Sequence, residues 1–253
     1  MKIEIIPCLK DNYSYLIIDE SNKKTCVIDP SESTPIANFL EKNNLKLNYI
    51  LNTHHHYDHV GGNVELKRKY NAKVIGFGED YKRIPKIDVK LKDEQIWKED
   101  NFEAKIIHIP GHTLGHICFY FFNENNLFTG DTLFSLGCGK IFEGSYEQMF
   151  LSLEKIKKLP KKTKIYCGHE YTLQNSKFCI TYDKENKNLI KKINDIKAKL
   201  KNYKPTVPST LEEELKNNIF LRSNNEKIKS NLNIKNSSDL TTFSKLRDLK
   251  DNF

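Results

Sequence analysis

The sequence has no apolar run approaching the roughly 20 residues that a helix needs to span a membrane. Its first residues, Met1 to Pro7, carry one lysine, but Glu4 interrupts them and no long apolar region follows. This start predicts a first β-strand rather than a signal peptide. We also find no internal repeat.

Cysteine pairs spaced C-x-x-C are absent as well. The six cysteines are scattered, several of them inside apolar runs, at positions 8, 26, 118, 138, 167 and 179. Buried reduced thiols fit this distribution better than a disulfide framework does. We therefore expect a cytoplasmic protein.

Apolar residues are few, at 38% of the chain, but they occur in dense clusters such as residues 15–18 and 117–122. Clusters of this kind can build a core, which argues against disorder of the whole chain. A length of 253 residues allows one large domain, or a medium domain with a smaller one.

Positive charge is distributed unevenly along the chain. Residues 171–253 hold 17 Lys and Arg against 10 Asp and Glu, whereas residues 1–170 hold 24 against 23. The excess either attracts an anionic ligand or belongs to a lysine-rich, solvated helical surface.

Apolar periodicity predicts an α/β domain over residues 1–170, followed by a helical domain over residues 171–253. The expected strands are 2–7, 13–19, 25–29, 48–52, 73–77, 105–109, 117–122, 126–129 and 164–167. Helices are expected at 34–42, 63–70 and 146–159. Beyond residue 171, lysine-rich segments carry apolar residues at helical spacing and show few strand signals.

A histidine cluster, Thr53-His54-His55-His56-Tyr57-Asp58-His59, directly follows the expected strand 48–52. His54 and His56 are two residues apart, so in an extended segment they point the same way and can bind one metal ion. Asp58 and His59 come where the chain should turn into a helix, so they can face a second ion. Four of the eight histidines fall within the six residues 54–59, which favours a metal site over a chance polar loop.

Further ligands are expected after three other strands. His112, Asp131 and His169 each follow a glycine at a predicted strand end. Taken singly, each would more often be a turn or cap residue. Taken with the cluster, they form a set of imidazoles and carboxylates suited to Zn²⁺ or a similar ion.

With these motifs in order, the sequence resembles the metallo-β-lactamase superfamily, and within it the glyoxalase II family. The resemblance rests on T-H-H-H-Y-D-H, G-H-T-L-G-H, T-G-D-T and C-G-H-E-Y, and on Asp11-Asn12-Tyr13. It implies a four-layer αββα sandwich with a helical C-terminal domain. It also implies that His54, His56 and His112 bind one metal, that Asp58, His59 and His169 bind the other, and that Asp131 bridges both.

The same resemblance implies a glutathione-binding set. Gly137 to Gly144 resembles the family's glutathione loop, and the implied contacts are Lys140, Phe142, Tyr171, Arg247 and Lys250. Phe142 stands where better-known members have a tyrosine. One hydroxyl donor is therefore lost, at a cost of about 1 kcal/mol in binding.

The implied activity is hydrolysis of S-2-hydroxyacylglutathione thioesters, such as S-D-lactoylglutathione, in methylglyoxal detoxification. We expect two divalent metals, zinc most of all, with iron or manganese as alternatives. A hydroxide bridging them would attack the thioester, with Asp58 and Asp131 as catalytic residues. We expect a monomer that binds neither nucleic acid nor membrane.

Three other functions remain open from the residues alone. A lactonase or a nuclease could use the same binuclear site. A persulfide dioxygenase would use a single iron, and the set of seven ligands argues against it. A non-enzymatic protein could bind nucleic acid or an acidic partner through the basic helices. His55, His108 and His116 are expected to serve structural or supporting roles, and Ser145 with Tyr146 to begin a helix.

Overall fold

The computed structural model describes residues 1–253, which form two compact units. Unit 1 comprises Met1–His108 and Gly115–Gly130, and unit 2 comprises Ile109–Leu114 and Asp131–Phe253. None of the helices combines the length and the apolar character that crossing a membrane would require. All six cysteines are buried and none forms a disulfide, as the sequence predicted.

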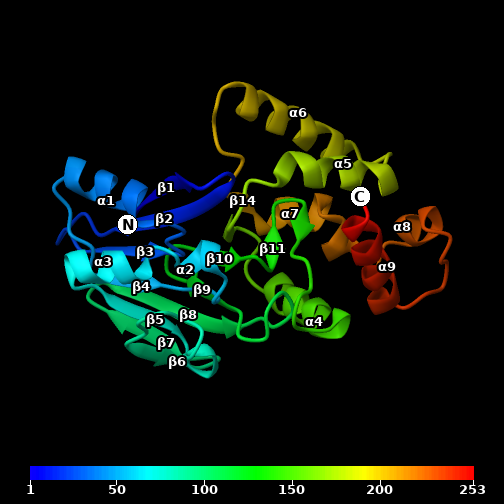
Figure 1. Ribbon diagram of the computed structural model, residues 1–253. Helices are drawn as coiled ribbons and strands as arrows, with labels where there is room; N and C mark the ends of the chain where they lie inside the picture. Colours follow the sequence, from blue (N-terminus) through cyan, green and yellow to red (C-terminus); the bar gives the residue numbers. More distant parts are fainter. The chain divides into compact units, whose positions relative to one another are not determined.

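Unit 1 begins with a six-stranded sheet whose order follows the chain, from β1 to β6 (Figure 1). The strands are β1 (Lys2–Cys8), β2 (Asn12–Ile18), β3 (Thr25–Ile28), β4 (Tyr49–Leu51), β5 (Lys73–Phe77) and β6 (Val89–Leu91). The first three pair antiparallel, as the predicted meander requires, and the pairs from β3 to β6 are parallel.

Two helices cover one face of this sheet, α1 (Ser33–Lys42) and α3 (Asn63–Tyr70). Their apolar residues, such as Ile36, Leu40 and Leu66, join alternate residues of the strands, such as Leu16 and Ile50, in one buried cluster. The short helices α2 (Tyr57–Val60) and η1 (Gly78–Asp80) follow β4 and β5.

The other strands of unit 1 are β7 (Ile96–Glu99), β8 (Phe102–His108), β9 (Ile117–Phe121) and β10 (Asn126–Gly130), paired in the order β10-β9-β8-β7. Aromatic rings fill the space between the two layers. The ring of Tyr15 lies 5.4 Å from that of Phe128, and the ring of Tyr49 lies 5.6 Å from that of Trp97 and 5.9 Å from that of Phe102.

Sequence analysis missed two strands of unit 1, β6 and β7. Both lie at an edge of their layer, where only one face of the strand is buried. Leu91 and Trp97 are buried, while their neighbours Lys90 and Lys98 are exposed. Edge strands this short, interrupted by lysine, carry too little apolar signal to be recognised.

Unit 2 is mainly helical, in agreement with the predicted helical region after residue 171. Its helices are α4 (Tyr146–Lys157), α5 (Thr172–Tyr182), α6 (Lys187–Lys201), α7 (Leu211–Asn217), η2 (Ile219–Arg222), α8 (Glu226–Asn231) and α9 (Asp239–Asp251). Its short strands are β11 (Leu133–Phe134), β12 (Gly137–Cys138), β13 (Lys164–Cys167) and β14 (Ser209–Thr210). β11 pairs with β12, and β13 with β14.

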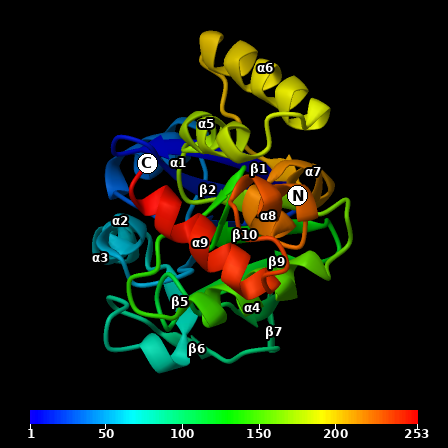
Figure 2. The same cartoon turned by 90° about the vertical axis from the view of Figure 1, so that its right-hand side faces the viewer.

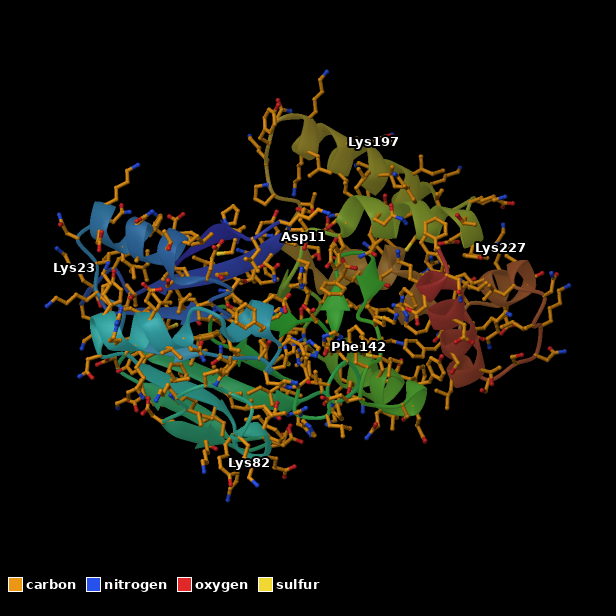
Figure 3. The ribbon with its side chains drawn as sticks, viewed as in Figure 1. Asp11, Lys23, Lys82, Phe142, Lys197 and Lys227 are labelled. Atoms are coloured by element: carbon orange, nitrogen blue, oxygen red, sulfur yellow. The ribbon has the colours of Figure 1, made fainter.

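The lysine-rich sequence of unit 2 is concentrated on α6, which packs against α5 (Figure 2). Leu189 and Ile196 of α6 are buried, whereas Lys191 and Lys197 are exposed. Figure 3 labels Lys197 on this helix. The helix therefore has the amphipathic character expected of a lysine-rich, solvated surface.

Replacing Leu40 with alanine should lower the free energy of unfolding by about 2–5 kcal/mol, since its fully buried side chain would leave a cavity between α1 and the sheet. Urea unfolding followed by circular dichroism measures the change. Leu151→Ala on α4 is the matched control, because that leucine is 52% exposed and should cost far less. Equal losses in both variants would contradict this assignment of the core.

Candidate metal and substrate site

The histidine cluster of unit 1 lies beyond the carboxyl ends of two neighbouring parallel strands, β3 and β4. Ile28 pairs with Leu51 at the ends of these strands, so Asp29 and Thr53 leave the sheet close together. Asp29 has a positive φ of 47°, which turns the chain at that point. α2 begins at Tyr57, immediately after His56.

The Asp29 carboxylate organises this cluster. It accepts hydrogen bonds from the backbone N–H of Thr53 at 2.7 Å and from the Thr53 hydroxyl at 2.6 Å. His59 Nδ1 lies 3.0 Å from the same carboxylate. Since a carboxylate only accepts, Nδ1 of His59 carries the proton, and Nε2 is left with the lone pair that a metal needs.

Asp58 and His59 face one another on α2, with 3.7 Å between Asp58 Oδ2 and His59 Nε2. Asn12 fixes the aspartate by donating from its side-chain amide to Oδ2 at 2.9 Å and to the backbone oxygen of Asp58 at 3.1 Å. The rings of His54 and His56 lie 4.8 Å apart. Unit 1 alone thus gathers the four predicted ligands of the cluster.

Two further histidines of unit 1 support the cluster. His116 is fully buried and stacks on His54, with ring centroids 4.5 Å apart. His55 Nδ1 lies 3.0 Å from Asp80 Oδ2. Burial alone would raise the pKa of Asp80, but its bonds to His55 and Arg83 outweigh burial and lower it, so the carboxylate stays ionised.

Gly130, at the end of β10, explains how these rings pack so closely. Its φ is +47°, and a Cβ atom there would lie 2.4 Å from the Thr53 hydroxyl oxygen and 2.8 Å from the ring of His116. Only glycine fits this position without displacing the side chains that hold His54.

Unit 2 brings together the other three predicted ligands, His112, Asp131 and His169. His169 Nε2 lies 3.2 Å and His112 Nε2 3.6 Å from Asp131 Oδ2, and all three side chains are buried. His112 Nδ1 donates to the backbone carbonyl of Lys140 at 2.7 Å, which again leaves Nε2 as the possible ligand atom.

Unit 2 also contains a cavity of about 320 Å³. Four of the five predicted substrate contacts line it, namely Lys140, Tyr171, Arg247 and Lys250. Tyr171 stacks on His169 with ring centroids 4.7 Å apart and planes inclined by 7°. The cavity and the Asp131 ligand set are therefore in direct contact through Tyr171 and His169.

The cations of this cavity differ in their surroundings. Arg247 is only 4% exposed and donates to the backbone oxygen of Cys138 at 2.7 Å and to Asp251 at 2.9 Å. Burial, followed by the charge of Arg247, lowers the pKa of Lys250. An anion bound beside Lys250 would offset both effects.

Phe142, the remaining predicted contact, does not line the cavity and is 61% exposed. Its ring lies 5.2 Å from that of His112, and the Lys140 ammonium lies 5.7 Å from its centroid. Figure 3 labels it in the segment that leads into α4. Phe142 therefore packs beside His112 on its solvent-exposed side.

The donor atoms in each unit fit a transition-metal ion. They combine imidazole nitrogens with carboxylate oxygens, whereas magnesium or calcium would favour oxygen ligands alone. At least two of the imidazoles, His59 and His112, are oriented through Nδ1 by a carboxylate or a carbonyl, as metal-binding histidines commonly are.

Sequence analysis missed two residues that hold this site, Asp29 and Asn12. Asp29 follows strand β3 and precedes Pro30, which resembles any turn aspartate. Asn12 lies within Asp11-Asn12-Tyr13, a motif noted without a role. A signal was available for Asp29, because the aspartate leaves the strand that neighbours the one leading into the histidines.

Comparison with known proteins places these features in a family. The family model described as the metallo-beta-lactamase superfamily matches residues 10–169, and the model described as the hydroxyacylglutathione hydrolase C-terminus matches residues 170–253. The hydroxyacylglutathione hydrolase of Pelagibacter ubique is 64% identical over 253 residues and covers 100% of both chains. That of Methylococcus capsulatus is 42% identical, covering 100% of this chain and 99% of its own.

Among solved structures, the BLEG-1 B3 metallo-beta-lactamase has a TM-score of 0.68 at 20% identity, covering 87% of this chain and 99% of its own. ETHE1 from Myxococcus xanthus has a TM-score of 0.67 at 20% identity, covering 100% of this chain and 91% of its own. At this identity the likeness concerns the fold alone. Together these findings confirm the predicted metallo-β-lactamase fold with its helical C-terminal region. The domain boundary expected at residue 170 stays a prediction.

Replacing Asp29 with asparagine should weaken metal binding about 10- to 100-fold, because an amide cannot accept from Thr53 and His59 as the carboxylate does. Competition with a chromophoric chelator measures the affinity. Asp19→Asn is the matched control, since Asp19 is also buried but caps a turn at Ser21. Unchanged affinity in Asp29→Asn would show that Asp29 does not orient the ligands.

Proposed function

This chain belongs to the hydroxyacylglutathione hydrolases of the metallo-β-lactamase superfamily, and we propose that it hydrolyses S-D-lactoylglutathione to D-lactate and glutathione. The proposal includes action as a cytoplasmic monomer on a small-molecule thioester. Such a reaction is the second step of methylglyoxal detoxification.

One observation carries the proposal, namely that the cationic cavity and the Asp131 ligand set of unit 2 share contacts. Tyr171 of the cavity stacks on His169, and the backbone of Lys140 accepts from His112. A ligand held in the cavity by its polar groups would therefore present an attached acyl group to the metal ligands.

The seven predicted ligands are proposed to hold two divalent ions. His54, His56 and His112 would bind one, Asp58, His59 and His169 the other, and Asp131 both. Zinc suits a set of imidazoles and carboxylates best, although iron and manganese also accept it. When bound, such ions supply positive charge that lowers the pKa of water and polarises a carbonyl.

The protein's own residues complete the chemistry. Asn12 holds Asp58 through Oδ2, so this carboxylate is fixed where it can accept a hydrogen bond from the attacking water. The buried carboxylate of Asp131 lies 3.6 Å from His112 Nε2 and 3.2 Å from His169 Nε2, so it stands beside the atoms that would bind the ions. The glutathione thiolate leaves without a strong general acid, since a thiol has a pKa near 8.5.

Recognition of glutathione is proposed to depend on charge. The thioester carries two carboxylates and one ammonium, so it is a net anion. Lys140, Arg247 and Lys250 offer it three cations in one cavity, and Asp251 is engaged by Arg247. A planar guanidinium suits a carboxylate because its fork can bind two oxygens.

Hydrolysis of S-D-lactoylglutathione, followed by loss of thioester absorbance, tests the function. The metal-loaded protein should turn the substrate over, and Asp131→Ala and His56→Ala should each lose activity by at least about 100-fold together with bound metal. His108→Ala is the control, because that histidine stacks on Phe77 outside the proposed site. No turnover by protein loaded with two metal ions would contradict the proposed substrate.

Replacing Phe142 with tyrosine should lower KM about fivefold, which is the effect of one added hydrogen bond of about 1 kcal/mol, while kcat stays unchanged. The exposed ring leaves room for a hydroxyl group. Steady-state kinetics with the same thioester measures the change. Tyr203→Phe, at a residue 99% exposed, should leave KM unaltered. A KM for Phe142→Tyr equal to that of the wild type would exclude a hydrogen bond to glutathione from this position.

A further inference from the structure

The cations that line the cavity come from two elements far apart in sequence. Lys140 belongs to the segment Gly137 to Gly144 that leads into α4, whereas Arg247 and Lys250 belong to α9. A substrate bound by both elements needs them held at a fixed separation. The contacts that join α4 and its preceding segment to α9 therefore bear on substrate affinity.

One connection runs through Arg247 itself. Its guanidinium donates to the backbone oxygen of Cys138 at 2.7 Å and lies 3.4 Å from that of Gly139. Its other terminal nitrogen donates to Asp251 at 2.9 Å. This connection uses a residue of the proposed binding site. Substituting Arg247 would therefore remove a proposed substrate contact and a structural contact together.

A second connection is independent of the cavity. The hydroxyl of Tyr146, the first residue of α4, donates to the carboxylate of Asp248 on α9. This bond, ahead of burial and the charge of Asp248, raises the pKa of Tyr146, so the phenol remains a donor at neutral pH. Neither Tyr146 nor Asp248 lines the cavity.

The position of this bond along α9 matters. α9 and α4 run beside one another (Figures 1 and 2), and the rings of Phe150 and Phe243 lie 5.8 Å apart between them. Phe243 and Leu246 are fully buried, so they hold the body of the helix. Lys250 lies in the last turn, which ends at Asp251, and last turns fray unless other contacts hold them.

We propose that Tyr146 is a positioning residue for the substrate, because its bond to Asp248 holds the last turn of α9 and with it the Lys250 ammonium against the cavity. The inference rests on the proposed function, since it assigns Lys250 to the glutathione part of the thioester. Tyr146 itself touches neither the substrate nor the metal ligands.

Kinetics of Tyr146→Phe with S-D-lactoylglutathione is the first test. KM should rise about three- to tenfold, the effect of losing one hydrogen bond that orders a binding group, and kcat should stay unchanged. Asp248→Ala should give the same increase. Asp248→Asn retains an oxygen acceptor for the phenol, so it should restore most of the wild-type KM. The double variant Tyr146→Phe/Asp248→Ala should be no worse than either single variant.

Three further measurements separate positioning from a general structural role. The lactoyl thioester of N-acetylcysteamine lacks both carboxylates of glutathione, so Tyr146→Phe should hydrolyse it at the wild-type rate. The melting temperature of Tyr146→Phe should match that of Tyr203→Phe, a control on an exposed tyrosine. Calorimetry with glutathione alone should show the same three- to tenfold weakening as KM.

The outcomes are distinct. An unchanged KM in Tyr146→Phe, beside an active wild-type enzyme, would overturn the positioning role and leave the proposed function intact. Equal losses with both thioesters, or a lowered melting temperature, would overturn it in favour of a structural role. A wild-type protein that neither binds glutathione nor hydrolyses its thioester would overturn the proposed function and this inference together.

Discussion

The carboxylate of Asp29 is the interaction on which the histidine cluster depends. It accepts hydrogen bonds from the Thr53 backbone N–H, the Thr53 hydroxyl and His59 Nδ1. One buried carboxylate thus connects the end of β3 to the segment after β4 and to α2. Burying a carboxylate is costly unless several donors satisfy it, and here three do. The bond to His59 also keeps its proton on Nδ1. The contacts that stabilise the fold here therefore leave Nε2 available to bind a metal.

In unit 2, too, single contacts have two roles. There the residues that orient possible metal ligands also belong to the proposed substrate cavity, as the pairs His112 with Lys140 and His169 with Tyr171 show. Binding energy from the glutathione part of a substrate can thus act on the reacting group, because the same side chains and backbone touch both. On the proposed assignment, substrate recognition and hydrolysis use the same positions.

The features that could be predicted from the sequence are those encoded by residues close together in the chain. Alternating apolar residues located most of the strands, and histidines directly after a strand located the cluster. The edge strands β6 and β7 escaped because half-exposed strands of three and four residues resemble loops. Asp29, Asn12 and the bond from Tyr146 to Asp248 escaped for another reason. Each acts on a partner between 24 and 102 positions away, and no local periodicity encodes such a contact.

The burial of the cysteines has a consequence for the cellular chemistry of this enzyme. Disulfides of the thiol that such a hydrolase releases would exchange readily with protein thiolates. Burial raises the pKa of Cys26, and it raises the pKa of Cys167 and Cys179 to about 12. Cys138 lines the cavity, but burial raises its pKa too, against the opposing charge of Arg247. These four cysteines therefore hold little thiolate at neutral pH, which disfavours their mixed-disulfide formation with the product.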